Sequence, residues 1–185
     1  MQRRPRPEPQ PLGRGASEAT AGARRPGGFV VRVGMGEGVV TSRPDAVLVA
    51  AGLGSCVAVV VHCPRPLVGG MAHVMLPRAF GDGQAPFKFA DTAVPALVRA
   101  LEEAGADAGR TAVRIVGGAG MFALPPTSPL NLGIRNVEAV REQLREGGLR
   151  LHGEDVGGSV SRTVALYVGT GRVTVRTAAG VEREL

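Results

Sequence analysis

The sequence contains no tryptophan, one tyrosine and five phenylalanines, so aromatic side chains make up only 3% of its 185 residues. A core must therefore be built mainly from Val, Leu, Ala and Ile, within a hydrophobic content of 44%. No run of about 18 apolar residues occurs, which argues against membrane insertion. The lack of interleaved aromatic residues and of any nucleic-acid-binding motif argues against nucleic-acid binding. We therefore expect a cytoplasmic protein.

Cysteine and histidine are also scarce, with two cysteines and three histidines. Cys56 and Cys63 lie in one apparent strand, about 23 Å apart at ~3.3 Å per residue. A disulfide needs Cα atoms within about 7 Å, so both thiols are expected to be free. The histidines, at positions 62, 73 and 152, show no ligand spacing, and no metal site is expected.

The positive charge is concentrated at the N-terminus. Residues 1–28 hold six arginines and two glutamates, a net charge of +4 out of the +6 of the whole chain. The same segment has five of the 14 prolines and few large apolar side chains. It cannot bury enough surface to offset chain entropy, so we predict a disordered basic tail over residues 1–28. Residues 29–185 are predicted to form a single domain.

The hydrophobic periodicity predicts an α+β fold of short strands and two helices. Apolar positions spaced i, i+3, i+4 and i+7 predict a helix from Asp91 to about Gly105, with Asp91 or Thr92 as its cap. Pro95 fits that helix only if it lies in the first turn. A second helix is predicted over 134–146. The predicted strands cover 29–33, 38–42, 46–51, 56–62, 68–76, 111–118, 149–154, 162–168 and 172–177.

Glycine-rich segments do not match nucleotide-binding motifs. Gly34, Gly36 and Gly38 precede a strand pattern, whereas a dinucleotide site requires a helix there. No glycine loop is followed by the Lys-Ser/Thr pair of a P-loop. These glycines therefore indicate turns.

An antiparallel hairpin of residues 56–62 and 69–76 would bring Cys56 close to His73. With residue 62 opposite residue 69, His73 is the diagonal neighbour of Cys56 on the same face; with 61 opposite 68, it lies directly opposite. Either register leaves about 5 to 8 Å between the two Cβ atoms. Only the register between them would place the two side chains on opposite faces.

A cysteine beside a histidine can form a nucleophile with its base. The imidazole would take the thiol proton, lower the pKa of the cysteine and leave a thiolate that attacks a carbonyl. Backbone N–H groups of the preceding loop, at Gly54 and Ser55, would stabilise the oxyanion. The alternative from these residues alone is a structural cysteine beside a core histidine.

The segments GLGSCVAVVVHCP and GGMAHVMLP resemble the chemoreceptor glutamine deamidase CheD family. The likeness continues, in family order, through KFADTAVPALV, IVGGAGMF, NLGIRN and EDVGGSVSR. The resemblance implies hydrolysis of glutamine side chains to glutamate in methyl-accepting chemotaxis receptors, with Cys56 as nucleophile and His73 as its partner. It implies no cofactor or metal. It also implies a layered α+β sandwich of mixed sheet, like that of deamidating toxins.

One position departs from the family pattern. The family commonly has a threonine at the end of the strand before the glycine loop, where this chain has Ala50 and Ala51. A methyl group cannot orient an imidazole by hydrogen bonding. In the family this threonine completes a Cys–His–Thr set. In this chain the role of the third member, to orient the imidazole, is vacant, filled by backbone, or filled by a residue such as Ser55 or Thr92.

The alternative function is a weakly active or inactive binding module for chemoreceptors or for the phosphatase CheC. A cysteine protease is a third hypothesis, but no sequence feature specific to peptide substrates supports it.

Overall fold

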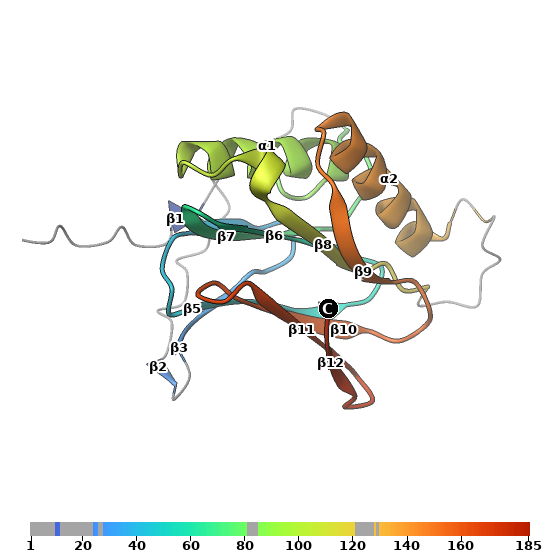
Figure 1. Ribbon diagram of the computed structural model, residues 1–185. Helices are drawn as coiled ribbons and strands as arrows, with labels where there is room; N and C mark the ends of the chain where they lie inside the picture. The colour runs from blue at the N-terminus through green and yellow to red at the C-terminus, as the bar shows by residue number, and fades with distance from the viewer. Residues whose placement is uncertain (1–9, 12–23, 26–27, 81–84, 121–127, 129) are drawn as a thin grey trace, which may run out of the picture.

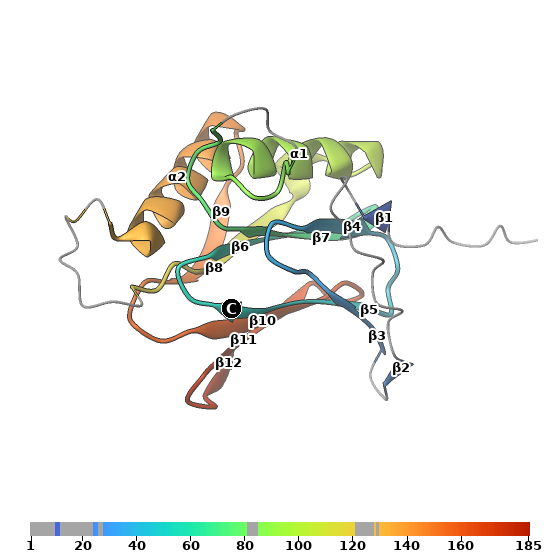
Figure 2. The ribbon, with the colours of Figure 1, turned by 180° about the vertical axis from the view of Figure 1, so that it is seen from behind.

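The computed structural model describes residues 10–11, 24–25, 28–80, 85–120, 128 and 130–185. Two helices and two mixed sheets form three layers (Figures 1 and 2). The helices α1 (Ala90–Glu103) and α2 (Leu132–Glu146) cover one face of the first sheet, and the second sheet packs against its other face. The predicted α+β layered fold is confirmed.

Each sheet has six strands, and each contains one parallel pair, β8–β9 in the first and β3–β5 in the second. In spatial order, the first sheet consists of β1 (Gln10–Pro11), β4 (Gly38–Thr41), β7 (Leu67–Val74), β6 (Val57–Pro64), β8 (Ala112–Gly117) and β9 (Leu151–Val156). The second consists of β12 (Glu182–Glu184), β11 (Arg172–Thr177), β10 (Arg162–Tyr167), β5 (Ala46–Leu53), β3 (Gly28–Arg32) and β2 (Arg24–Arg25). A short 3-10 helix, η1 (Ala108–Arg110), precedes β8.

The unbroken apolar run of β6 reflects its central position in the first sheet. Val57, Val59 and Val61 face the helices, whereas Ala58 and Val60 face the second sheet. A strand with a core on both faces needs no polar alternation. His62 lies in the same strand on the face toward the second sheet, and its Nε2 lies 3.0 Å from the carbonyl oxygen of Val168. The β6 strand therefore separates two apolar cores.

The predicted hairpin is formed by β6 and β7. His62 pairs with Gly69 and Ala58 with His73, which is the first of the two registers expected to bring Cys56 and His73 onto one face. The ladder ends at the pair Val57 and Val74. Cys56 follows directly beyond this end.

The helices differ from the prediction at their beginnings. The prediction that Asp91 or Thr92 caps α1 is wrong, because the N-cap is Phe89 and has no side-chain cap bond. The Asp91 carboxylate instead accepts the N–H of Ala79 at 3.0 Å. Pro95 is the sixth residue of α1, beyond the first turn. The predicted end of α2 is confirmed, since Gly147 is its C-cap, but the helix begins at Leu132, behind the N-cap Asn131, and not at residue 134.

Most of the predicted tail, residues 1–28, falls outside the described residues, and its disorder stays a prediction. Two short strands in it are described: β1 pairs with β4, and β2 pairs with β3. Of the helices in the described parts of the chain, none has the length and apolar character needed to cross a membrane.

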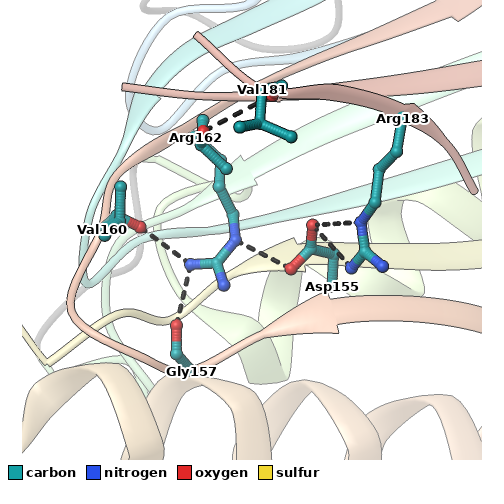
Figure 3. A network of polar contacts seen from close by, with 7 residues as sticks. Asp155, Gly157, Val160, Arg162, Val181 and Arg183 are labelled. Atoms are coloured by element: carbon teal, nitrogen blue, oxygen red, sulfur yellow. Dashed lines mark hydrogen bonds and ion pairs between the residues drawn. The ribbon is translucent and has the colours of Figure 1, made fainter. Parts of the chain in front are cut away.

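A cluster of charged residues joins β9, at the edge of the first sheet, to β10 and β12 of the second sheet (Figure 3). Asp155 in β9 accepts hydrogen bonds from Arg162 of β10, at 2.9 Å, and from Arg183 of β12, at 2.9 and 3.1 Å. Arg162 also donates to the carbonyl oxygens of Gly157 and Val160, at 2.8 and 2.9 Å. The side chains of Asp155 and Arg162 are only 9% and 10% exposed. The cluster therefore links the first sheet to the second and orders the connection between β9 and β10.

We predict that Asp155→Asn lowers the free energy of unfolding by about 3 kcal/mol, because it leaves the buried Arg162 guanidinium without its counter-ion. Glu154→Gln is the matched control. Glu154 pairs with Arg141 on the surface, with both side chains more than a third exposed, so its loss should cost less than about 1 kcal/mol. Urea denaturation of both variants measures the difference, and equal losses would contradict the prediction.

Candidate active site

Cys56 lies between the glycine loop and β6, just beyond the last pair of the β6–β7 ladder. It is half-buried and packs against the core between the two sheets. The thiol is free, as predicted, and so is that of Cys63. By the β6–β7 register, the side chains of Cys56 and His73 share the face that points toward the second sheet. The structure therefore brings the two predicted residues to one end of the inter-sheet space.

The imidazole of His73 is held in one tautomer. It is 2% exposed, and its Nδ1 lies 3.3 Å from the carbonyl oxygen of Val33, which follows β3. A carbonyl oxygen only accepts hydrogen bonds, so Nδ1 carries the proton and Nε2 keeps its lone pair. Nε2 is buried and has no hydrogen-bond partner among the described residues. His73 thus presents an unused proton acceptor at the site.

The turn between β3 and β4 surrounds His73 with backbone contacts. The N–H of Gly36 donates to the His73 carbonyl, and the N–H of His73 donates to the Glu37 carbonyl, both at 2.9 Å. The Glu37 carboxylate accepts the N–H of Gly34 at 2.8 Å, which closes the turn. Gly36 adopts a φ of 74°, a conformation that favours glycine. The turn therefore fixes His73 without any side-chain hydroxyl.

Burial sets the resting protonation of the pair. It raises the pKa of the Cys56 thiol, and the backbone N–H of Cys56 offsets this in part. It also lowers the pKa of His73, against smaller raising effects of the Val33 hydrogen bond and the Glu37 charge. The pair rests as a thiol and a neutral imidazole. The sequence-based expectation of a lowered cysteine pKa is not met, because burial between the sheets disfavours both charges.

Three carbonyl groups of the nucleophile loop, defined as residues 54–56, are held by hydrogen bonds from the bend after β8 and from α2. The carbonyl of Gly54 accepts the N–H of Ala119 at 2.7 Å, and that of Cys56 accepts the N–H of Gly118 at 2.8 Å. The carbonyl of Ser55 accepts the Nδ2 of Asn136 at 2.9 Å. The loop is therefore fixed at each of its peptide groups.

This arrangement sets the direction of the loop's N–H groups. The only cis peptide bond in the described residues joins Arg65 to Pro66, so the peptide bonds of the nucleophile loop are trans. In a trans peptide the N–H points away from the carbonyl before it. The N–H groups of Ser55 and Cys56 therefore point away from the donors that hold the loop. The N–H of Gly54 donates to the carbonyl of Gly52 at 2.9 Å and is occupied.

Gly133 allows α2 to approach the bend at residues 118–119 closely, next to the nucleophile loop. A Cβ atom on Gly133, in the first turn of α2, would lie 2.6 Å from the carbonyl oxygens of both Gly118 and Ala119. Such a distance is shorter than real Cβ contacts, so any other residue at 133 would displace α2 or the bend at 118–119. The position of Asn136 relative to the loop depends on this approach.

Of the two side chains predicted as candidates for orienting His73, Thr92 is engaged elsewhere, and Ser55 stays a prediction. The Thr92 hydroxyl donates to the carbonyl oxygens of Pro86 and Phe89, at 2.6 and 3.2 Å. Ala50 is fully buried in the inter-sheet core. In the described parts of the chain, no three His, Cys, Asp or Glu side chains are grouped to hold a metal ion.

Sequence reasoning missed three contributors to the site: the Val33 carbonyl, Glu37 and Asn136. The first is a backbone group, which carries no residue-type signal. Asn136 lies in the NLGIRN segment singled out above, but only the fold places its amide beside the nucleophile loop.

Comparison with known proteins gives consistent matches. Residues 75–177 match the family described as CheD chemotactic sensory transduction. A Symbiobacterium thermophilum protein named probable chemoreceptor glutamine deamidase CheD is 46% identical over 157 residues, which cover 83% of this chain and 95% of that protein. The chemoreceptor glutamine deamidase CheD of Thermotoga maritima is 45% identical over 151 residues, which cover 82% of this chain and 94% of that protein.

We predict that alkylation of native Cys56 by iodoacetamide keeps accelerating with pH up to at least about pH 9, because burial raises the pKa of this thiol. A thiolate with a lowered pKa would instead react at a constant rate from below neutral pH upward. Mass spectrometry of the Cys56 peptide gives the rate at each pH. The buried Cys63 should remain unmodified in the native protein, and both thiols should react in denaturant.

Proposed function

The chain belongs to the CheD family of chemotactic sensory transduction proteins, and we propose from this premise that it hydrolyses glutamine side-chain amides of chemoreceptors to glutamate and ammonia. The observation that carries the proposal is the buried, unpartnered Nε2 of His73 on the face that Cys56 shares. A proton acceptor on the same face as a thiol is an arrangement from which nucleophilic attack on an amide can start.

In the proposed reaction, the Cys56 sulfur bonds to the amide carbon of the glutamine side chain while the thiol proton passes to Nε2 of His73. Because the resting pair is neutral, this proton transfer accompanies the attack. The imidazolium then protonates the amide nitrogen, the C–N bond breaks, and ammonia leaves a thioester. Water attacks the thioester as His73 takes one of its protons. The C–S bond breaks, glutamate is released, and the sulfur regains a proton.

Backbone N–H groups of the nucleophile loop stabilise the oxyanion in this proposal. The direction of the Cys56 N–H is set by the held carbonyl of Ser55. Ser55 and Cys56 are therefore better donors than Gly54, whose N–H is occupied by Gly52. One such donor is worth roughly 3 to 4 kcal/mol in the transition state.

The backbone of the β3–β4 turn takes the third role, that of orienting His73. The Val33 carbonyl accepts the Nδ1 proton, and the Glu37 charge favours the imidazolium that forms during the reaction. This supports activity despite Ala50, where the family commonly has threonine. The fully buried methyl group of Ala50 contributes packing to the inter-sheet core.

Chemoreceptors are the proposed substrates, since both relatives described above carry that word in their names. The phosphatase CheC is a further proposed partner, and the cytoplasm is the proposed location. A chain that binds receptors without modifying them is the second candidate function, and Ala50 is the observation that favours it. Receptor binding without any conversion of glutamine to glutamate would decide for that candidate.

We predict that Cys56→Ala and His73→Ala each reduce receptor deamidation to background, because one removes the nucleophile and the other its base. Cys63→Ala is the matched control and should stay within about twofold of the unmodified protein, since Cys63 lies at the other end of β6. Mass spectrometry of receptor cytoplasmic fragments detects each conversion of glutamine to glutamate. Activity retained in Cys56→Ala would overturn the assignment.

We predict that Ala50→Thr leaves kcat within about twofold, because the Val33 carbonyl already orients His73. The added atoms enter a fully buried position, so the free energy of unfolding should fall by about 1 to 3 kcal/mol. Deamidation kinetics and urea denaturation of the same preparation test both parts. A rise of two- to tenfold in kcat, the gain of one ordinary hydrogen bond, would show that the orienting role had been vacant.

A further inference from the structure

We propose that Asn136 is a positioning residue of the site: its side-chain NH₂ group fixes the two strand ends that carry Cys56 and His73 relative to each other. The inference deepens the proposed deamidase function and depends on it for its meaning. Nδ2 of Asn136 donates to the carbonyl oxygen of Ser55 at 2.9 Å and to that of Met75 at 2.8 Å. Ser55 precedes the nucleophile, and Met75 lies two residues after His73.

The amide replaces hydrogen bonds that the β-ladder no longer makes. Beyond Val57 and Val74 the strands separate, since the N–H groups of Met75 and Leu76 both turn to the carbonyl of Lys88, at 2.9 and 3.1 Å. In a continued ladder, the N–H of Leu76 would face the carbonyl of Ser55. Asn136 supplies a donor to each strand end at this point. The strands can therefore diverge beside the thiol without leaving these two carbonyls unpaired.

The contact with Ser55 also sets the orientation of the Cys56 N–H. That N–H belongs to the same peptide plane as the Ser55 carbonyl and points the opposite way. Because Asn136 holds the carbonyl on the helix side, the N–H is directed away from the helix layer. The proposed oxyanion donor therefore depends on a residue that does not contact the substrate.

The chemistry of the side chain fits this role. Two carbonyl oxygens need two hydrogens, which an amide NH₂ provides, whereas a hydroxyl offers one and a carboxylate none. Asn136 is fully buried, and its Oδ1 has no hydrogen-bond partner among the described residues. An unpaired buried acceptor lowers stability, so an apolar side chain would serve packing alone better. The two donated hydrogen bonds are what distinguishes asparagine here.

The test uses the same substitution at Asn136 in α2 and at Asn131, the N-cap of this helix. Asn136→Asp removes the donors that hold the two strand ends. Asn131→Asp is the matched control, because Asn131 caps the helix through its Oδ1, which accepts the Ile134 N–H at 3.4 Å and which aspartate retains. Asn136→Leu removes the hydrogen bonds without adding charge. Each variant is assayed for folded fraction, deamidation kinetics and alkylation of Cys56.

For both Asn136 variants we expect kcat, corrected for folded fraction, to fall about 10²-fold relative to Asn131→Asp, with KM within about threefold. Alkylation of Cys56 should shift to higher pH, because the N–H that lowers the pKa of the thiol is no longer held. A loss of helix stability alone would move neither readout in the folded fraction. Values of kcat and alkylation within twofold of Asn131→Asp, or an equal loss in Asn131→Asp, would overturn the proposal.

A measurement on the unmodified protein covers the case in which both Asn136 variants fail to fold. Hydrogen exchange of the Asn136 side-chain amide, followed by NMR, should be slowed about 10²-fold or more relative to a free asparagine, and rapid exchange would overturn the bridge. Failure of the deamidase function itself appears separately. In that case the unmodified protein converts no receptor glutamine, while alkylation and exchange still report whether Asn136 holds the strand ends.

Discussion

The position of the Cys56 thiol depends on the three hydrogen bonds that hold the carbonyl groups of residues 54–56. Their donors, Ala119, Gly118 and Asn136, come from the bend after β8 and from α2. Main-chain bonds of this kind require close approach of backbones, which Gly133 permits by having no side chain. The imidazole is held from the opposite side, by the Val33 carbonyl after a strand of the second sheet. All three layers of the fold therefore contribute to one site.

The location of the site between the sheets determines how its chemistry begins. A thiolate and an imidazolium would both lose hydration there, so the neutral pair is the stable form. The same low dielectric strengthens the hydrogen bonds that the loop can offer to a developing oxyanion. In the proposed mechanism, activation of the nucleophile is thus deferred until a substrate carbonyl is present, and in the absence of substrate the thiol reacts slowly with other electrophiles.

The sequence was most informative where regular patterns extend over many residues. The apolar run of β6 and the β7 pattern gave the strands, and the limited choice of registers was enough to place Cys56 and His73 on one face. It was least informative where a backbone group, or a residue far away in the sequence, makes the decisive contact. The start of α1 was misplaced because Asp91 binds the N–H of Ala79 in the preceding loop instead of capping the helix. No spacing rule relates Asn136 to Ser55, which lies 81 positions earlier. The role of Val33 rests on a carbonyl, which every residue type possesses.

Two histidines, His62 and His73, lie in the same inter-sheet layer, with a main-chain carbonyl as partner of each. Burial is the largest influence on both, and it lowers the pKa of each imidazole below its ordinary value. In the unfolded chain these rings take up protons as the pH falls through about 6.5, whereas in the fold they do so only at lower pH. Mild acidification therefore shifts the equilibrium toward unfolding, and it acts through two groups in the contact between the sheets. The fold that keeps His73, the proposed base, unprotonated is for the same reason sensitive to acid.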